Sequence, residues 1–87
     1  MLEKKMVILN EEGMHARPAG AFVKTANEFK SAVEIRANGV SKNGKSLMGL
    51  MSLGLSKDSE ITLVVTGDDE SQALDKLSLL VQNKFQL

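Results

Sequence analysis

The chain has 87 residues, and its eleven Lys plus Arg residues balance eleven Asp plus Glu residues, so the formal net charge at pH 7 is zero. A chain of this length is expected to form one domain over residues 1–87, with too little interior for an organic cofactor. The balanced charge, the scarcity of aromatic residues and the absence of cysteine argue against nucleic-acid binding, disulfides and a bound metal.

The N-terminal segment predicts a strand followed by a loop. Met1 to Lys5 is not followed by a long apolar run, so we expect no signal peptide, no membrane insertion and a cytoplasmic protein. Residues Lys5 to Leu9 are apolar and predict the strand. Asn10-Glu11-Glu12-Gly13 then predicts the loop, in which Gly13 supplies backbone freedom.

The only histidine and the only proline of the chain lie together, as His15 and Pro18. Proline is tolerated in the first turn of a helix, so the helix is expected to begin next to His15. The apolar residues that follow recur at the three-and-four spacing of a helix with one buried face, which supports this prediction. They are Ala19, Phe22, Val23, Ala26 and Phe29.

An imidazole at this position favours the neutral, nucleophilic form, because free helix N–H groups and Arg17 disfavour a second positive charge. The same groups would stabilise a phosphoryl group on His15, with Ala16 and Arg17 as the phosphate-binding residues. The site therefore suits transient phosphorylation. The alternative is that His15 is an ordinary capping or solvated residue.

The middle of the chain predicts a hairpin and a short helix. Ala32 to Arg36 alternates as a half-buried strand, Asn38-Gly39 marks a tight turn, and Val40 to Asn43 is a weakly signalled return strand. From Lys45 to Gly54 the pattern is that of a short helix, capped by Ser46 and stopped at Gly54.

The short helix is apolar nearly all round, so part of it must remain exposed. Exposed apolar residues, and methionines above all, are typical of docking surfaces. We expect Leu47, Met48 and Met51 to contact partners. An ordinary core helix explains the pattern equally well, and Ser46 is also explained as a plain N-cap.

The C-terminal part predicts a strand and a long helix. Ile61, Leu63 and Val65 alternate with Thr62, Val64 and Thr66, and Gly67 to Glu70 provides a turn, a cap and negative charge for the helix. The residues expected to be buried on that helix are Ala73, Leu74, Leu77, Leu80 and Val81. The expected fold is an α+β open-faced sandwich, a four-stranded antiparallel sheet with a wet outer face and three helices on the other face.

Two motifs, residues 13–19 and 45–54, together resemble the histidine-containing phosphocarrier (HPr) family of the bacterial phosphoenolpyruvate-dependent sugar phosphotransferase system, and the resemblance covers essentially the whole chain. It implies the element order β-α-β-β-α-β-α and a carrier, not an enzyme. His15 would accept a phosphoryl group from enzyme I and pass it to sugar-specific IIA components, while Arg17 steadies it. Ser46 would be the regulatory site of HPr kinase/phosphorylase.

Two other hypotheses remain open. One is a regulator that acts only by binding a catabolite-control transcription factor after phosphorylation of Ser46; family members of that type lack the histidine. The other is an ordinary interaction domain with a ferredoxin-like fold, which would leave the cluster from Gly13 to Ala19 a coincidence.

Three positions depart from the family pattern. Glu12 stands where a small polar residue is more frequent, and its carboxylate would repel a phosphoryl group on His15. Gly20 falls inside the first predicted helix, where glycine costs about 1 kcal/mol relative to alanine. Lys42 occupies an expected apolar position in the strand before the second motif.

Overall fold

The computed structural model describes residues 1–86, which form four strands and three helices in the predicted order β-α-β-β-α-β-α. The strands are β1 (Leu2–Val7), β2 (Ala32–Ala37), β3 (Val40–Asn43) and β4 (Glu60–Thr66), and the helices are α1 (Ala16–Ala26), α2 (Leu47–Ser52) and α3 (Glu70–Gln82).

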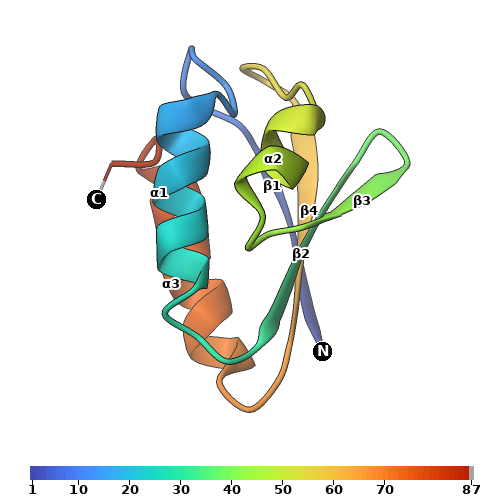
Figure 1. Ribbon diagram of the computed structural model, residues 1–87, viewed down its shortest axis with the longest axis vertical. Coiled ribbons are helices and arrows are strands. Elements are labelled where there is room, and N and C mark those ends of the chain that lie inside the picture. The colour runs from blue at the N-terminus through green and yellow to red at the C-terminus, as the bar shows by residue number, and fades with distance from the viewer. Residues whose placement is uncertain (87) are drawn as a thin grey trace.

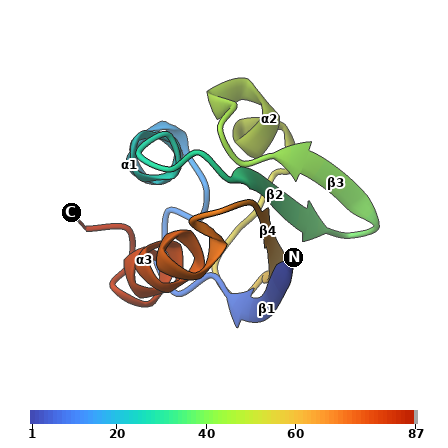
Figure 2. The ribbon, with the colours of Figure 1, turned by 90° about the horizontal axis from the view of Figure 1, so that it is seen from below.

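The strands form one antiparallel sheet in the order β1-β4-β2-β3, and all three helices lie on the same side of it (Figures 1 and 2). Fully buried side chains such as Phe22 of α1, Leu63 of β4 and Leu77 of α3 form the core between the sheet and the helices. The predicted α+β open-faced sandwich is confirmed. Within residues 1–86 no helix combines the length and the apolarity needed to cross a membrane.

The sequence predicts that the outer face of the sheet is exposed to solvent. The structure differs from this prediction at one residue of the central strand β4. Val64 is only 3% exposed although it points away from the core cluster. In the register it lies opposite Glu3 of β1 and Glu34 of β2, one on each side. A residue on a central strand is flanked by side chains on both neighbours, which explains its burial.

The first strand differs from the prediction, which placed it at Lys5 to Leu9. The strand begins earlier, at Leu2. It lies at the edge of the sheet, where polar side chains such as Lys4 can stay exposed, so an apolar run is not needed to form it. Its ladder ends at Val7, opposite Glu60. Ile8 still exchanges backbone hydrogen bonds with Asp58 and Ser59, but Asp58 has a φ of 73° and no longer continues a strand.

The helices differ from the prediction at their ends. α1 stops at Ala26, so Phe29 packs against the core from a loop, and Val23 is only partly buried. On α3, Leu74 is likewise only partly buried, while Ser78 is buried.

The segment from Gly67 to Glu70 was expected to provide a cap for α3, and Asp69 occupies the N-cap position without a hydrogen bond from its side chain to that helix. Its carboxylate instead accepts hydrogen bonds from the backbone N–H groups of Lys30 and Ser31, both at 2.9 Å, and from the Ser31 hydroxyl. These donors, the Ser31 hydroxyl first, hold the pKa of Asp69 below its ordinary value. The carboxylate of Asp69 thus stabilises the loop between α1 and β2.

Candidate functional site

A clamped loop delivers His15 to the start of α1. The N–H of Gly13 donates to the carbonyl of Asn10 at 3.1 Å, and the buried Asn10 amide donates to the carbonyl of Gly13 at 2.7 Å. The N–H of Met14 donates to the carbonyl of Leu55 at 3.0 Å, and the Met14 side chain is buried. The two residues before His15 are therefore fixed, Gly13 to its own loop and Met14 to the chain after α2.

Gly13 is required where it stands. Its φ is +66°, and a Cβ built on it would lie 2.3 Å from the Leu55 carbonyl oxygen and 2.7 Å from Cα of Ser56. Residues that carry a side chain rarely adopt this backbone conformation. A shift of the neighbouring backbone atoms would also cost free energy of folding. The close approach of the two segments thus depends on the glycine.

His15 is the N-cap of α1, as the sequence predicts, and it is exposed. Its backbone is extended, with φ −77° and ψ −174°, and its carbonyl accepts the N–H of Ala19 at 2.8 Å. The imidazole makes no capping hydrogen bond to the helix. An N-cap side chain usually accepts such a bond, so here the ring is free for other chemistry.

The surroundings of His15 suit an anion. Ala16 and Arg17 are exposed in the first turn of α1, which contains no acidic residue, and their N–H groups precede the first intrahelical donor. The positive end of the helix dipole and the guanidinium of Arg17 both favour negative charge there. The structure therefore brings His15, Ala16 and Arg17 together at one exposed helix end.

Two acidic residues share a hollow with Arg17. Glu11 and Glu12 are exposed and line, with Arg17, a hollow of about 270 Å³ that also includes Lys84. Glu12 therefore borders the same hollow as Arg17, the residue proposed below to hold a phosphoryl group. The cationic Lys84 lines the same hollow and offsets part of the negative charge.

Ser46 is the N-cap of α2, as predicted. Its Oγ accepts the N–H of Gly49 at 3.1 Å, and its carbonyl accepts the N–H of Leu50 at 3.0 Å. Leu50 is fully buried, so it anchors this short helix to the core. Next to the cap, the ammonium of Lys45 donates to the carbonyl of Phe29 at 2.7 Å.

The other apolar side chains of α2 form an exposed surface, defined here as Leu47, Met48 and Met51. Met48 is 82% exposed, and the other two are about 40% exposed, at 41% and 43%. The pattern was equally compatible with a core helix, and that alternative holds for Leu50 and, in part, for Leu53, which packs against the core. Figure 1 shows the end of α2 and the start of α1 at the same end of the molecule, joined by the bond from Met14 to Leu55.

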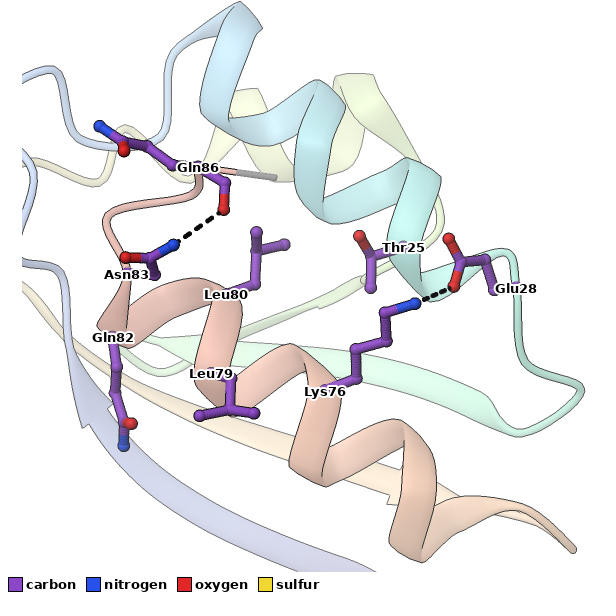
Figure 3. A pocket seen from close by; sticks show the side chains of 8 residues that line it. All are labelled: Thr25, Glu28, Lys76, Leu79, Leu80, Gln82, Asn83 and Gln86. Carbon is purple, nitrogen blue, oxygen red and sulfur yellow. Dashed lines mark hydrogen bonds and ion pairs between the residues drawn. The ribbon is translucent and has the colours of Figure 1, made fainter.

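Another hollow lies elsewhere, between α1 and α3, with a volume of about 650 Å³ (Figure 3). Lys76 and Glu28 form an ion pair of 2.6 Å across its rim, and the buried Thr25 hydroxyl has no hydrogen-bond partner there. None of the predicted site residues lines it.

The sequence analysis missed the contributions of Asn10 and of the C-terminal segment. An Asn three residues before a Gly is a local turn signal, so Asn10 could have been found. Nothing local indicated that Lys84 to Gln86 would lie beside Arg17, 67 positions or more earlier in the chain.

Comparison with known proteins gives consistent matches over nearly the whole chain. The family model described as "PTS HPr component phosphorylation site" matches residues 2–83. HPr-like protein Crh of Bacillus subtilis (strain 168) is 44% identical over 84 residues, 97% of this chain and 99% of Crh. Phosphocarrier protein HPr of Treponema pallidum (strain Nichols) is 41% identical over 86 residues, 99% and 98% of the two chains. The crystal structure of HPr-C-His from Thermoanaerobacter tengcongensis superposes with a TM-score of 0.95 at 42% identity, covering 100% of both chains.

Proposed function

Because this chain belongs to the HPr family, the phosphocarriers of the phosphotransferase system, we propose that it is a general phosphoryl carrier that is loaded by enzyme I on His15 and unloaded onto sugar-specific IIA components. The observation that carries the proposal is an exposed N-cap imidazole, without a capping hydrogen bond, beside the exposed Arg17. The carrier would work in the cytoplasm as one domain over residues 1–87.

The transfer step needs little machinery. A lone pair on an imidazole nitrogen of His15 attacks the phosphorus held by the donor, an N–P bond forms, and the bond to the donor breaks with its electron pair returning to the donor. The new negative charge then meets the N–H groups of Ala16 and Arg17 and the Arg17 guanidinium. Such a reaction depends mainly on positioning and on charge stabilisation, which a small rigid corner supplies.

The exposed surface of Leu47, Met48 and Met51 is proposed to dock both enzyme I and the IIA components. The helix that carries it, α2, ends near the start of α1 (Figure 1), and methionine side chains adapt to differently shaped partners. One carrier surface could in this way serve several proteins in turn.

Ser46 is proposed as a regulatory phosphorylation site for HPr kinase/phosphorylase. Its hydroxyl already caps α2, and a phosphoserine, with roughly 1.5 to 2 negative charges, would be favoured at that helix start while it changes the field over the docking surface. We expect weaker docking of enzyme I and little structural change. A catabolite-control transcription factor is the proposed partner of the modified form.

A regulator that only binds is the second candidate, and the 44% identity to the HPr-like protein Crh favours it. In that case Ser46 would be modified and His15 would be idle. The exposed His15 and the acid-free first turn of α1 support the carrier instead.

The deciding experiment is incubation with phosphoenolpyruvate and enzyme I, followed by intact mass spectrometry and an acid-lability assay. We expect one acid-labile phosphoryl group, absent from the His15→Ala variant and formed more slowly on Arg17→Ala. Labelling of His15→Ala would refute the assignment of the acceptor. A wild-type protein that stays unlabelled, yet is phosphorylated by the kinase and ATP on Ser46, would establish the regulator.

A further inference from the structure

Methionine is the only sulfur-containing residue type in this chain. The sequence has five methionines and no cysteine. Thiols and thioethers are the side chains with well-established reversible oxidation chemistry in proteins, so mild oxidation of this protein is expected at its methionines. Which of the five react depends on how far the fold exposes each thioether.

The fold separates the five methionines into buried and exposed ones. Met6 and Met14 are buried and belong to the core cluster. Met48 and Met51 are exposed, and both lie on α2, three positions apart. Met1 is also exposed and precedes β1. An oxidant in solution therefore reaches the two methionines of α2 without any opening of the core.

The anchors of α2 are other residues. Leu50 is fully buried in the core, and the Oγ of Ser46 accepts the N–H of Gly49 at 3.1 Å at the start of the helix. Neither anchor changes when an oxygen is added to the exposed thioethers of Met48 and Met51. Changes at exposed side chains usually leave stability nearly unchanged, so oxidation is expected to alter the surface of α2 and leave the fold intact.

We propose that Met48 and Met51 form a reversible oxidation site that controls docking. The inference rests on the proposed carrier function, in which Leu47, Met48 and Met51 dock enzyme I and the IIA components. A peroxide would convert each flexible, apolar thioether into a polar sulfoxide within this surface. A sulfoxide oxygen that is buried against an apolar partner loses its hydrogen bonds to water, which disfavours the complex.

The oxidation step is balanced with a peroxide as the only oxidant. A lone pair on the Met48 sulfur attacks one oxygen of hydrogen peroxide, and an S–O bond forms as the O–O bond breaks. The departing hydroxide takes the proton from the oxygen now bound to sulfur and leaves as water. Sulfur is thereby oxidised by two electrons and the peroxide is reduced.

The reverse step returns the site to its apolar form. Methionine sulfoxide reductases, one for each sulfoxide epimer, carry it out. Two thiols supply the electrons, become a disulfide, and release the sulfoxide oxygen as water. Reversal distinguishes this modification from permanent damage, because the docking surface is restored without new synthesis of the protein.

The test treats the carrier alone with hydrogen peroxide, removes the oxidant with catalase, and measures loading by enzyme I from the same organism at varied carrier concentration. Peptide mass spectrometry should locate the added oxygen on Met48 and Met51, with Met6 and Met14 unmodified. We expect the KM for the oxidised carrier to rise by at least about fivefold, with kcat within about twofold, because docking and not the His15 chemistry is altered. Both reductases with dithiothreitol should restore the original KM.

The double variant Met48→Leu/Met51→Leu is the matched control. Leucine is close to methionine in volume and is apolar, but it has no sulfur, so the docking surface stays apolar while the oxidation site is lost. The variant keeps Met1 and His15, which controls for oxidation at those residues. We expect peroxide to leave its KM unchanged. The oxidised wild type should keep its circular dichroism spectrum and a Tm within about 4 °C of the untreated protein.

The outcomes separate the inference from the function on which it rests. An oxidised wild type with unchanged KM would overturn the inference and leave the carrier function intact. An equal rise in KM for the treated double variant would assign the effect to another residue, and unfolding of the oxidised wild type would assign it to loss of the fold; both results overturn the inference. Failure of enzyme I to load the untreated wild type would overturn the carrier function, and with it the control of docking.

Discussion

Replacing Gly13 by alanine tests whether one glycine holds the His15 corner in position. The added Cβ would lie 2.3 Å from the carbonyl oxygen of Leu55, the same oxygen that accepts the N–H of Met14. It would also force alanine into a backbone with φ +66°. The substitution therefore opposes the hydrogen bond that positions the residue before His15.

The magnitude follows from two separate effects. A left-handed backbone angle on a non-glycine residue costs about 1–2 kcal/mol. Overlap with a packed neighbour costs a further 1–3 kcal/mol or so, because backbone atoms have to shift. Their sum is about 2–5 kcal/mol, and each kcal/mol lowers the Tm of a domain of this size by about 4–8 °C. We expect a fall in Tm of at least about 8 °C.

Gly39→Ala is the matched control. Gly39 also has a positive φ, +75°, but a Cβ built on it meets nothing within 4 Å. It should show only the backbone effect of about 1–2 kcal/mol. Differential scanning calorimetry and chemical denaturation of both variants measure the difference, which isolates the overlap at Gly13.

Loading by enzyme I gives a second measure of the same perturbation. A displacement of His15 by about 1 Å can reduce a positioned reaction by about a hundredfold, so Gly13→Ala should be loaded far more slowly than Gly39→Ala. If the two variants are equally stable and equally active, the close approach of Gly13 to Leu55 does not hold the site, and the reasoning is refuted.

Three further predictions concern the cap of α2, the loop clamp and the core. Ser46→Ala should lower the free energy of unfolding by about 0.5–2 kcal/mol through loss of the bond to Gly49, whereas Ser46→Asp should keep a capping oxygen yet slow loading by enzyme I; equal loading rates at low salt would contradict this. The pKa of Asp69 is lowered, so its stabilising effect is present above its ordinary pKa of about 3.9 and is lost as the pH falls through the lower folded value. The stability difference between wild type and Asp69→Asn should therefore shrink from pH 7 toward about pH 2, and a difference independent of pH in urea titrations would exclude the clamp. Leu50→Ala should cost about 2–5 kcal/mol in chemical denaturation, and Met48→Ala, which alters an 82% exposed side chain, should cost less than about 0.5 kcal/mol; similar values would show that α2 is not anchored by Leu50.

Signals carried by neighbouring residues predicted much of this protein correctly. Pro18 just after His15 indicated where α1 begins, and Ser46 before an apolar run indicated the start of α2. The Asn38-Gly39 turn is found with φ of 54° and 75°, the two left-handed angles that such a hairpin requires. Each of these depends on interactions within four or five positions of the chain, so the sequence alone reveals them.

Features that depend on distant segments emerged only from the tertiary structure. Asp69 accepts hydrogen bonds from Ser31 instead of capping its own helix. Val64 is buried between the two neighbouring strands. Phe85 lines a hollow together with Arg17. No local pattern encodes which segments meet, because that choice is made by the packing of the whole core. The sequence by itself thus determined where α1 begins and which side chains stand at the His15 corner, while tertiary packing decided which surfaces surround that corner and therefore what can approach it.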